Sequence, residues 1–209
     1  MLSAWWRWRA DRLLDRARSR DRSGLTGART EALLRSALAA AERAASADHR
    51  ARVLDALVTL GARDERAIPA HDLDSWIEQR VALGTDELER ASILSALALA
   101  LRAARQPRRA EPLAHRALAL LDDALPAGDP RLEQALDTVA SIELRLGRHA
   151  DAEATLSRLL ALEEQRGDGL ELADTLNRLA QVKRALGKNV EASDLDERVA
   201  ELRERRQPP

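Results

Sequence analysis

Apolar residues recur along this chain at the spacing of amphipathic helices, and the same arrangement returns after about 40 residues. Leu94, Leu136 and Leu176 occupy one register, with offsets of 42 and 40 residues. Four further sets of positions keep step with them: Leu97, Val139 and Leu179; Ala98, Ala140 and Ala180; Ala100, Ile142 and Val182; and Ala104, Leu146 and Leu186. A period of this length predicts a stack of helical repeats.

The first helix of each predicted repeat carries two apolar stripes. In the repeat that begins near residue 130, one stripe comprises Ala135, Val139, Ile142 and Leu146, and the other comprises Leu132, Leu136, Ala140 and Leu144. A helix with two apolar stripes needs neighbours on two sides, and stacked pairs of antiparallel helices provide them.

Turn and cap residues fall in the same frame. A turn is expected at Arg105, Gly147 and Gly187, and a small residue for close packing follows at Ala110, Ala152 and Ala192. Helix starts are expected at Asp86, Asp129 and Asp168, with Asp48 at the comparable place one unit earlier. Because these carboxylates recur with the repeat, we interpret them as helix caps and not as catalytic groups.

The composition also favours an all-α protein and limits its chemistry. The 209 residues include no Phe, Tyr or Cys, and aromatic residues make up only 2%. Without Cys there is no disulfide, thiol catalysis or Cys-based zinc site. The chain has no glycine-rich phosphate loop, and no two of its four histidines lie within four residues of each other. We therefore expect no enzyme activity, no cofactor and no metal site.

Charge and hydropathy give no reason to expect nucleic acid or a membrane span. The formal net charge is −1, so no basic surface for nucleic acid is indicated. No run of 18 apolar residues occurs, and the start of the chain lacks the apolar segment of a secretory signal. The expected location is cytoplasmic.

The spacing of small residues around each turn resembles the tetratricopeptide repeat. The pattern is carried by Ala98–Arg105–Ala110, Ala140–Gly147–Ala152 and Ala180–Gly187–Ala192. The segment RRAEPLAHRALALL (108–121), the 42-residue spacing and the loop at Gly128–Pro130 resemble the kinesin-light-chain-like subtype. The resemblance implies an all-α fold, a right-handed α-α superhelix of antiparallel helix pairs.

The resemblance also implies a domain organisation. We expect a solenoid over 28–206, with a degenerate repeat at 48–85, clear repeats at 87–126, 129–166 and 168–206, and a tail at 207–209. Four residues depart from the family pattern, at three positions of the repeat: Arg105 replaces the turn glycine, Glu143 and Lys183 replace a large ring, and Asp196 replaces a large apolar residue.

In this family the first helices line a concave groove that holds a peptide. The matching positions are Ser95, Leu99 and Arg102, then Asp137, Ser141 and Arg145, then Asn177, Gln181 and Arg184. A ladder of three arginines along this groove predicts a partner segment with carboxylate groups. The alternative is that these arginines are solvated and partly paired to Asp137 and Asp174.

Residues 1–22 differ from the repeats. They contain Trp5, Trp6 and Trp8, with seven arginines against three aspartates. Trp6, Ala10, Leu13 and Ala17 are expected on one helix face. Three interpretations stay open: a helix that caps the solenoid, a helix that docks on a partner, and a helix on an anionic membrane surface. The aspartates and the short apolar stripe oppose the last of these.

Together these patterns predict a non-catalytic scaffold or adaptor that binds a protein or peptide. One alternative is a structural or accessory subunit docked through its tryptophan-rich helix, and another is a regulatory module of a signalling system. The sequence leaves the oligomeric state and the identity of the partner open.

Overall fold

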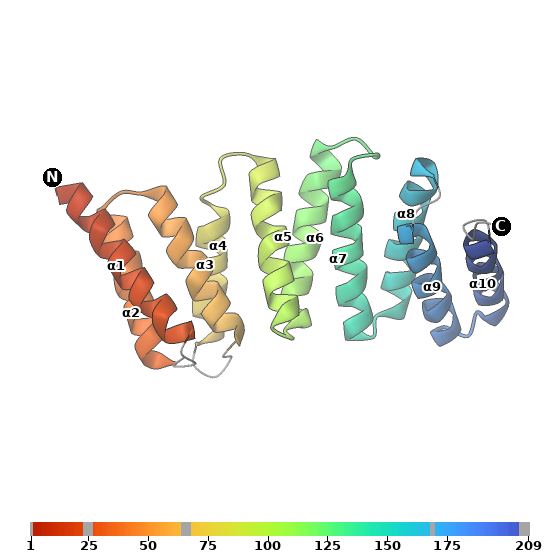
Figure 1. Cartoon of the computed structure of the whole chain (residues 1–209), viewed down its shortest axis with the longest axis horizontal. Helices are drawn as coiled ribbons and strands as arrows, with labels where there is room; N and C mark the ends of the chain where they lie inside the picture. The colour runs from red at the N-terminus through yellow and green to blue at the C-terminus, as the bar shows by residue number, and fades with distance from the viewer. Residues whose placement is uncertain (1, 23–26, 64–67, 168–169, 205–209) are drawn as a thin grey trace. The chain divides into compact units, whose positions relative to one another are not determined.

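The structure, a computed structural model, describes residues 2–22, 27–63, 68–167 and 170–204 (Figure 1). These residues form ten helices and no strand: α1 (Leu2–Arg22), α2 (Ala28–Arg43), α3 (Ala47–Arg63), α4 (Ala70–Val81), α5 (Glu87–Ala103), α6 (Pro107–Ala124), α7 (Pro130–Leu146), α8 (His149–Arg166), α9 (Leu170–Ala185) and α10 (Asn189–Glu204). The expected tail at 207–209, and the start of the last predicted repeat at residue 168, lie outside the described residues.

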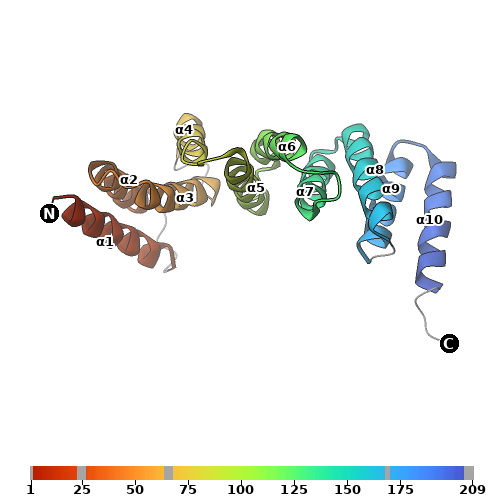
Figure 2. The same cartoon turned by 90° about the horizontal axis from the view of Figure 1, so that it is seen from above.

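The helices gather into two compact units, Met1–Gln106 and Pro107–Pro209. In the first unit α1, α2, α3 and α4 pack in succession, and α5 contacts both α3 and α4. In the second unit each helix from α6 to α10 packs on the next. Successive helices of each unit run in alternating directions (Figure 1), and the view from above shows each helix beside the next within its unit (Figure 2). Each unit is therefore built from antiparallel helix pairs.

The repeat register found in the sequence marks buried positions. Leu94, Leu136 and Leu176 are at most 1% exposed. The small residues of the register are all fully buried: Ala98, Ala140 and Ala180 on first helices, and Ala110, Ala152 and Ala192 on second helices. Alanine at these places lets neighbouring helix backbones approach closely, which confirms the packing role predicted for them.

Four helices end in the same C-terminal motif. A residue one or two positions after each helix has a positive φ: 50° at Ala45, 61° at Arg105, 71° at Gly147 and 79° at Gly187. The next N–H donates to the carbonyl five residues back, from Ser46 to Ala41, Gln106 to Leu101, Arg148 to Glu143 and Lys188 to Lys183. This is the bond of a Schellman motif, and it confirms the predicted turns.

Arg105 is expected to destabilise its turn, because a residue with a Cβ carries a cost of about 1 kcal/mol in the left-handed region that glycine does not. Replacing Arg105 with glycine should therefore raise the free energy of unfolding by about 0.5–1 kcal/mol, measured by urea titration with circular dichroism. Gly147→Ala is the reciprocal control and should lower it by a similar amount. A loss of stability in R105G would contradict this account of the turn.

Helix starts are capped by carboxylates, as the sequence indicated, with one correction. Asp86 accepts the Glu89 N–H at 2.7 Å, and Glu89 in turn accepts the Thr85 N–H at 2.7 Å. Asp129 accepts the Arg131 N–H at 2.9 Å. Hydrogen bonds from the Arg131 side chain and backbone lower the pKa of Asp129 to about 2.

The correction concerns the start of α3. Asp48 was expected to cap this helix, but α3 begins at Ala47. The hydroxyl of Ser46 instead lies 3.5 Å from the His49 N–H, three residues on, where a cap acts. Asp48 therefore belongs to the first turn, where its charge favours the helix dipole. The cap expected at Asp168 lies outside the described residues.

Candidate functional site: the face of α7 and α9

Two stripes of polar residues that are exposed or partly exposed run along α7 and α9, the first helices of the two repeats in the second unit. The stripe on α7 contains Asp137, Ser141 and Arg145, and the stripe on α9 contains Asn177, Gln181 and Arg184. Spacings of four and then three or four residues keep each stripe on one side of its helix. These six residues define what is called here the α7–α9 face.

Several members of this face already have partners within the unit. Asp137 forms an ion pair with Arg178, which joins α7 to α9. Asn177 donates from Nδ2 to the Ala173 carbonyl of its own helix at 2.6 Å. Arg184 forms an ion pair with Asp196 on α10. The alternative drawn from the sequence paired the ladder arginines with Asp137 and Asp174. In the structure both of these carboxylates face Arg178 instead, and the ladder residue Arg184 pairs with Asp196.

The remaining predicted groove residues differ in exposure. Arg145 and Gln181 are exposed. Ser95, Leu99 and Arg102 lie on α5 in the first unit, where each is partly exposed. The structure therefore brings together the part of the predicted site that lies on α7 and α9, and the α5 residues form a separate stripe on the other unit.

A cavity of about 620 Å³ opens between the first halves of α7 and α9 and the last turns of α8. Five carboxylates line it: Glu133, Asp137, Glu163, Glu171 and Asp174. Two guanidinium groups also line it, from Arg166 and Arg178. This hollow is called the α7–α9 pocket below, and Asp137 belongs both to it and to the α7–α9 face.

The buried side of the pocket is formed by Glu163 of α8 and Thr175 of α9. Glu163 is 5% exposed and Thr175 is 2% exposed. The Thr175 hydroxyl donates to Glu163 Oε1 at 3.2 Å. Burial raises the pKa of Glu163, and the neighbouring carboxylates Glu133 and Glu171 add to this effect. The pocket therefore contains a carboxyl group that is costly to ionise without a counter-charge.

The rim of the pocket is an alternating network of charges. Arg166 is 2.5 Å from Glu133 Oε2 and 2.5 Å from Glu171 Oε2. Arg178 pairs with Asp137 and lies 4.0 Å from Asp174 Oδ2. Each guanidinium is thus shared between two carboxylates, which leaves the pocket acidic as a whole.

Comparisons with known proteins place this geometry in a family. A model described as "Tetratricopeptide repeat" matches residues 131–205, and a second model with the same description matches residues 90–128. Together the two matches span more than half of the sequence. The chain belongs to the tetratricopeptide repeat family. No curated protein matches the chain.

Solved structures show the same fold. Two crystal structures of kinesin light chain nearly identical TPR-like repeats from Podosopora anserina are each 19% identical to this chain. For one of them the TM-score is 0.64, and the match covers 100% of this chain and 99% of the other chain. For the second the TM-score is 0.61, and the match covers 93% of this chain and 94% of the other chain. BtubC (BKLC) from P. vanneervenii is 18% identical, with a TM-score of 0.58 and coverage of 100% and 94%. These similarities confirm the tetratricopeptide solenoid fold predicted from the sequence.

The sequence analysis did not predict the buried polar residues of the pocket, Glu163 and Thr175, although the sequence of this tetratricopeptide repeat chain contains a signal for them. Glu163 stands 42 residues after Leu121 and Thr175 stands 40 after Ala135, so both replace apolar residues of the repeat. Arg178 stands 41 residues after Asp137, close to one repeat length, which places them on successive first helices. Polar residues that interrupt a repeated apolar register mark the pocket.

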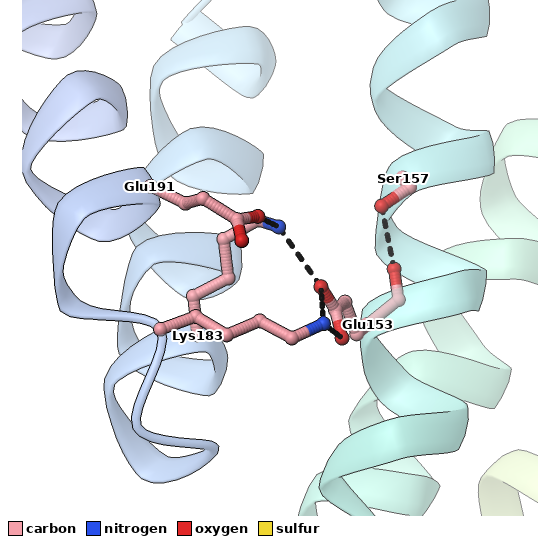
Figure 3. Close-up of polar contacts among 5 residues, drawn as sticks. Glu153, Ser157, Lys183 and Glu191 are labelled. Atoms are coloured by element: carbon pink, nitrogen blue, oxygen red, sulfur yellow. Dashed lines mark hydrogen bonds and ion pairs between the residues drawn. The ribbon is translucent and has the colours of Figure 1, made fainter.

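A second polar cluster ties α8 to the end of α9, the start of α10 and the turn between them (Figure 3). Lys183 Nζ lies 2.8 Å from Glu153 Oε1 and also pairs with Glu191. Lys188 Nζ lies 2.7 Å from Glu153 Oε2. Hydrogen bonds from Lys183 and then Lys188 lower the pKa of Glu153. With all these charges mutually paired, the Glu153 cluster serves to hold the helices together.

The N-terminal helix divides its tryptophans between core and surface. Ala10, Leu14 and Ala17 are 1% exposed, so Leu14 and not Leu13 occupies the buried face. The spacing of four and three residues explains this, and Leu13 lies on the flank. Trp6 packs against a buried cluster with Ala40 and Ala41 of α2.

Trp5 and Trp8, in contrast, face outward, with 46% and 53% of their surface exposed. Arginines stack on both rings, with the Arg9 guanidinium 5.2 Å from the Trp5 ring centre and that of Arg12 5.1 Å from the Trp8 ring centre. No described helix of the chain is both long and apolar enough to cross a bilayer.

Proposed function

We propose that this tetratricopeptide repeat protein is a non-catalytic scaffold that holds a segment of a partner protein on the α7–α9 face. The family supports a protein-interaction scaffold in general. One observation carries the finer proposal: the α7–α9 pocket opens between the same two helices that present the polar stripes. A hollow flanked by two rows of hydrogen-bonding groups suits an extended chain better than a small molecule.

The polar groups of this face match the needs of a peptide. Gln181 is exposed and its side-chain amide can pair with peptide N–H and C=O groups. Arg145 is exposed near the end of α7 and favours a carboxylate of the segment by bidentate hydrogen bonds. The stripe of Ser95, Leu99 and Arg102 on α5 extends the proposal to the first unit, as an additional surface for the same kind of partner.

The test is affinity capture from the cells that make the protein, with the full chain as bait. The bait variant Arg145→Glu with Gln181→Glu should lose a partner that the wild type retains. Arg108→Glu is the matched control, since Arg108 is exposed at the start of α6, a second helix. If the double variant and the wild type capture the same proteins in equal amounts, the α7–α9 face is not the binding surface.

A second candidate function, docking as an accessory subunit of a larger assembly, is favoured by the exposed tryptophans of α1. Trp and Arg are the residues most enriched at binding hot spots, and here Trp5 and Trp8 are presented with Arg9 and Arg12 stacked on them. Trp6 is excluded from this role because it packs against the buried cluster on α2.

The bait Trp5→Ala with Trp8→Ala separates the two functions. Docking through α1 would be supported if this variant loses a partner that the Arg145 and Gln181 variant still captures. Retention of every partner would remove the accessory-subunit proposal. Recovery of the wild type with anionic vesicles, and not of the tryptophan variant, would instead assign this surface to a membrane.

A further inference from the structure

The polarity of the α7–α9 pocket is not required by the repeat fold. The position of Glu163 is occupied by Leu121 in the preceding repeat, where the leucine is 6% exposed. The position of Thr175 is occupied by Ala135 and Ile93, which are 6% and 7% exposed. The same chain has apolar residues at both positions in other repeats. Packing alone therefore does not explain why Glu163 and Thr175 are polar.

Glu163 has one oxygen without a partner. Its Oε1 accepts the Thr175 hydroxyl, whereas its buried Oε2 has no hydrogen-bond partner among the described residues. A buried carboxylate oxygen without a partner costs roughly 1–3 kcal/mol. A donor from outside the chain that pairs with this carboxylate at the pocket wall, after a turn of the carboxylate plane, would offset that cost.

The charge around Glu163 decides which donor fits. Five carboxylates and two guanidinium groups line the pocket, so carboxylates exceed guanidinium groups by three. Arg166 and Arg178 are each shared between two of these carboxylates. A carboxylate or phosphate ligand would therefore meet net repulsion, and a cation would meet net attraction.

We propose that the α7–α9 pocket receives an arginine or lysine side chain of the partner segment, whose cation pairs with the carboxylate of Glu163. This inference rests on the proposed scaffold function and names the chemistry that one of its pockets recognises. The volume of about 620 Å³ leaves room for the long apolar stem of either side chain. Arg145 selects a carboxylate at the other end of α7, so the segment carries opposite charges at its two contact points.

The test uses the isotope-labelled full chain and four amino-acid amides as probes, followed by NMR, with the α-amino group of each probe acetylated so that only the side chain can carry charge. Arginine amide or lysine amide should cause saturable shifts of the backbone signals of Glu163 and Thr175. Norleucine amide, which has an uncharged side chain of similar length, and glutamate amide should cause no saturable shift at these residues. The relative response to the two cationic probes assigns the guanidinium or the ammonium group.

Two variants make the result specific to Glu163. Glu163→Gln should weaken binding of the cationic probe at least about tenfold, because removing a charge from a buried ion pair costs well over 1.4 kcal/mol. Glu164→Gln is the matched control: the neighbouring residue loses the same charge, but Glu164 pairs with Arg198 outside the pocket and should leave binding unchanged.

The proposal is overturned if norleucine amide shifts the same signals equally, if E163Q binds the cationic probes as well as the wild type, or if no probe gives a saturable shift. These outcomes leave the scaffold proposal standing, because the capture experiment depends on Arg145 and Gln181, outside the pocket. The opposite result is also informative. If cations bind to the pocket but the Arg145 and Gln181 variant captures the same proteins as the wild type, the proposal that the α7–α9 face binds the partner is refuted and the proposal that the pocket binds a cation stands.

Discussion

Replacing Leu176 with alanine is expected to lower the free energy of unfolding of the second unit by about 3 kcal/mol. Leu176 lies on α9 with no exposed surface, in a core cluster with Leu156 and Leu159 of α8 and Leu195 of α10. Truncation would remove contacts with helices on both sides and leave a cavity that the helix backbones cannot close. Urea titration followed by circular dichroism measures the change.

Two controls accompany the Leu176 variant. Val190→Ala removes an apolar side chain that is 78% exposed, and should change stability by less than about 0.5 kcal/mol. All four tryptophans lie within residues 1–106, so their fluorescence follows the first unit while circular dichroism follows the whole chain. A loss below about 1 kcal/mol in L176A would contradict the burial assigned to this register.

Glu143→Leu is expected to stabilise the protein by about 2 kcal/mol at pH 8, the cost of burying a polar atom without a partner, and by much less at pH 4. Glu143 is 2% exposed on α7, and its Oε2 has no hydrogen-bond partner among the described residues. Burial raises the pKa of this carboxyl group, against the opposing effects of the Thr155 hydrogen bond and of His115. The leucine is a residue that the chain itself places there, because Leu101 holds the same position one repeat earlier.

The sign of the pH dependence follows from the raised pKa. A carboxyl group that binds its proton more tightly in the folded state stabilises that state at low pH, and this contribution is lost as the pH rises through the folded pKa. The difference in stability between E143L and the wild type should therefore grow from pH 4 to pH 8. Taking the difference cancels groups with the opposite trend, such as Asp129 and Glu153, whose pKa values are lowered.

Glu164→Leu provides the matched control for the Glu143 variant. It makes the same change on α8 at a side chain that is 41% exposed, and it should have little effect at either pH. A pH-independent gain in E143L would show that only better packing is involved. A loss of stability at pH 8 would show that the hydrogen bond from Thr155 outweighs the cost of burying the charge.

The fold could be predicted from the sequence because the same pattern of apolar, small and turn residues recurs in each repeat. The register of Leu94, Leu136 and Leu176, and the turns at Arg105 and Gly147, are each determined by residues close in the chain or by direct repetition. Periodicity of this kind is the strongest signal in a single sequence. The exception is α3, where Ser46 competes with Asp48 for the same cap and only the helix start decides between them.

The site was predicted less completely than the fold, because a helical pattern shows on which side of its helix a residue lies but not which residue it contacts. The pattern predicted that Asp137 and Arg184 lie on the outer sides of their helices, and both side chains are at least partly exposed. It could not show that Arg178 and Asp196 would pair with them, since these pairs depend on how neighbouring helices are rotated and on rotamers. It did place Trp6 on the apolar face of its helix with Ala10 and Ala17, and Trp6 is packed there whereas Trp5 and Trp8 are exposed.

The Glu153 cluster has a practical consequence for studying partners. Lys183 and Lys188 are the only lysines of the chain, and both are paired to this one carboxylate. Amine-reactive crosslinkers would therefore attach to side chains at a single edge of the protein. The reaction would also neutralise an amine that pairs with Glu153, and so would weaken the contact between α8 and the end of α9. Reagents that couple to carboxyl or guanidinium groups are the appropriate choice for mapping contacts made by α7.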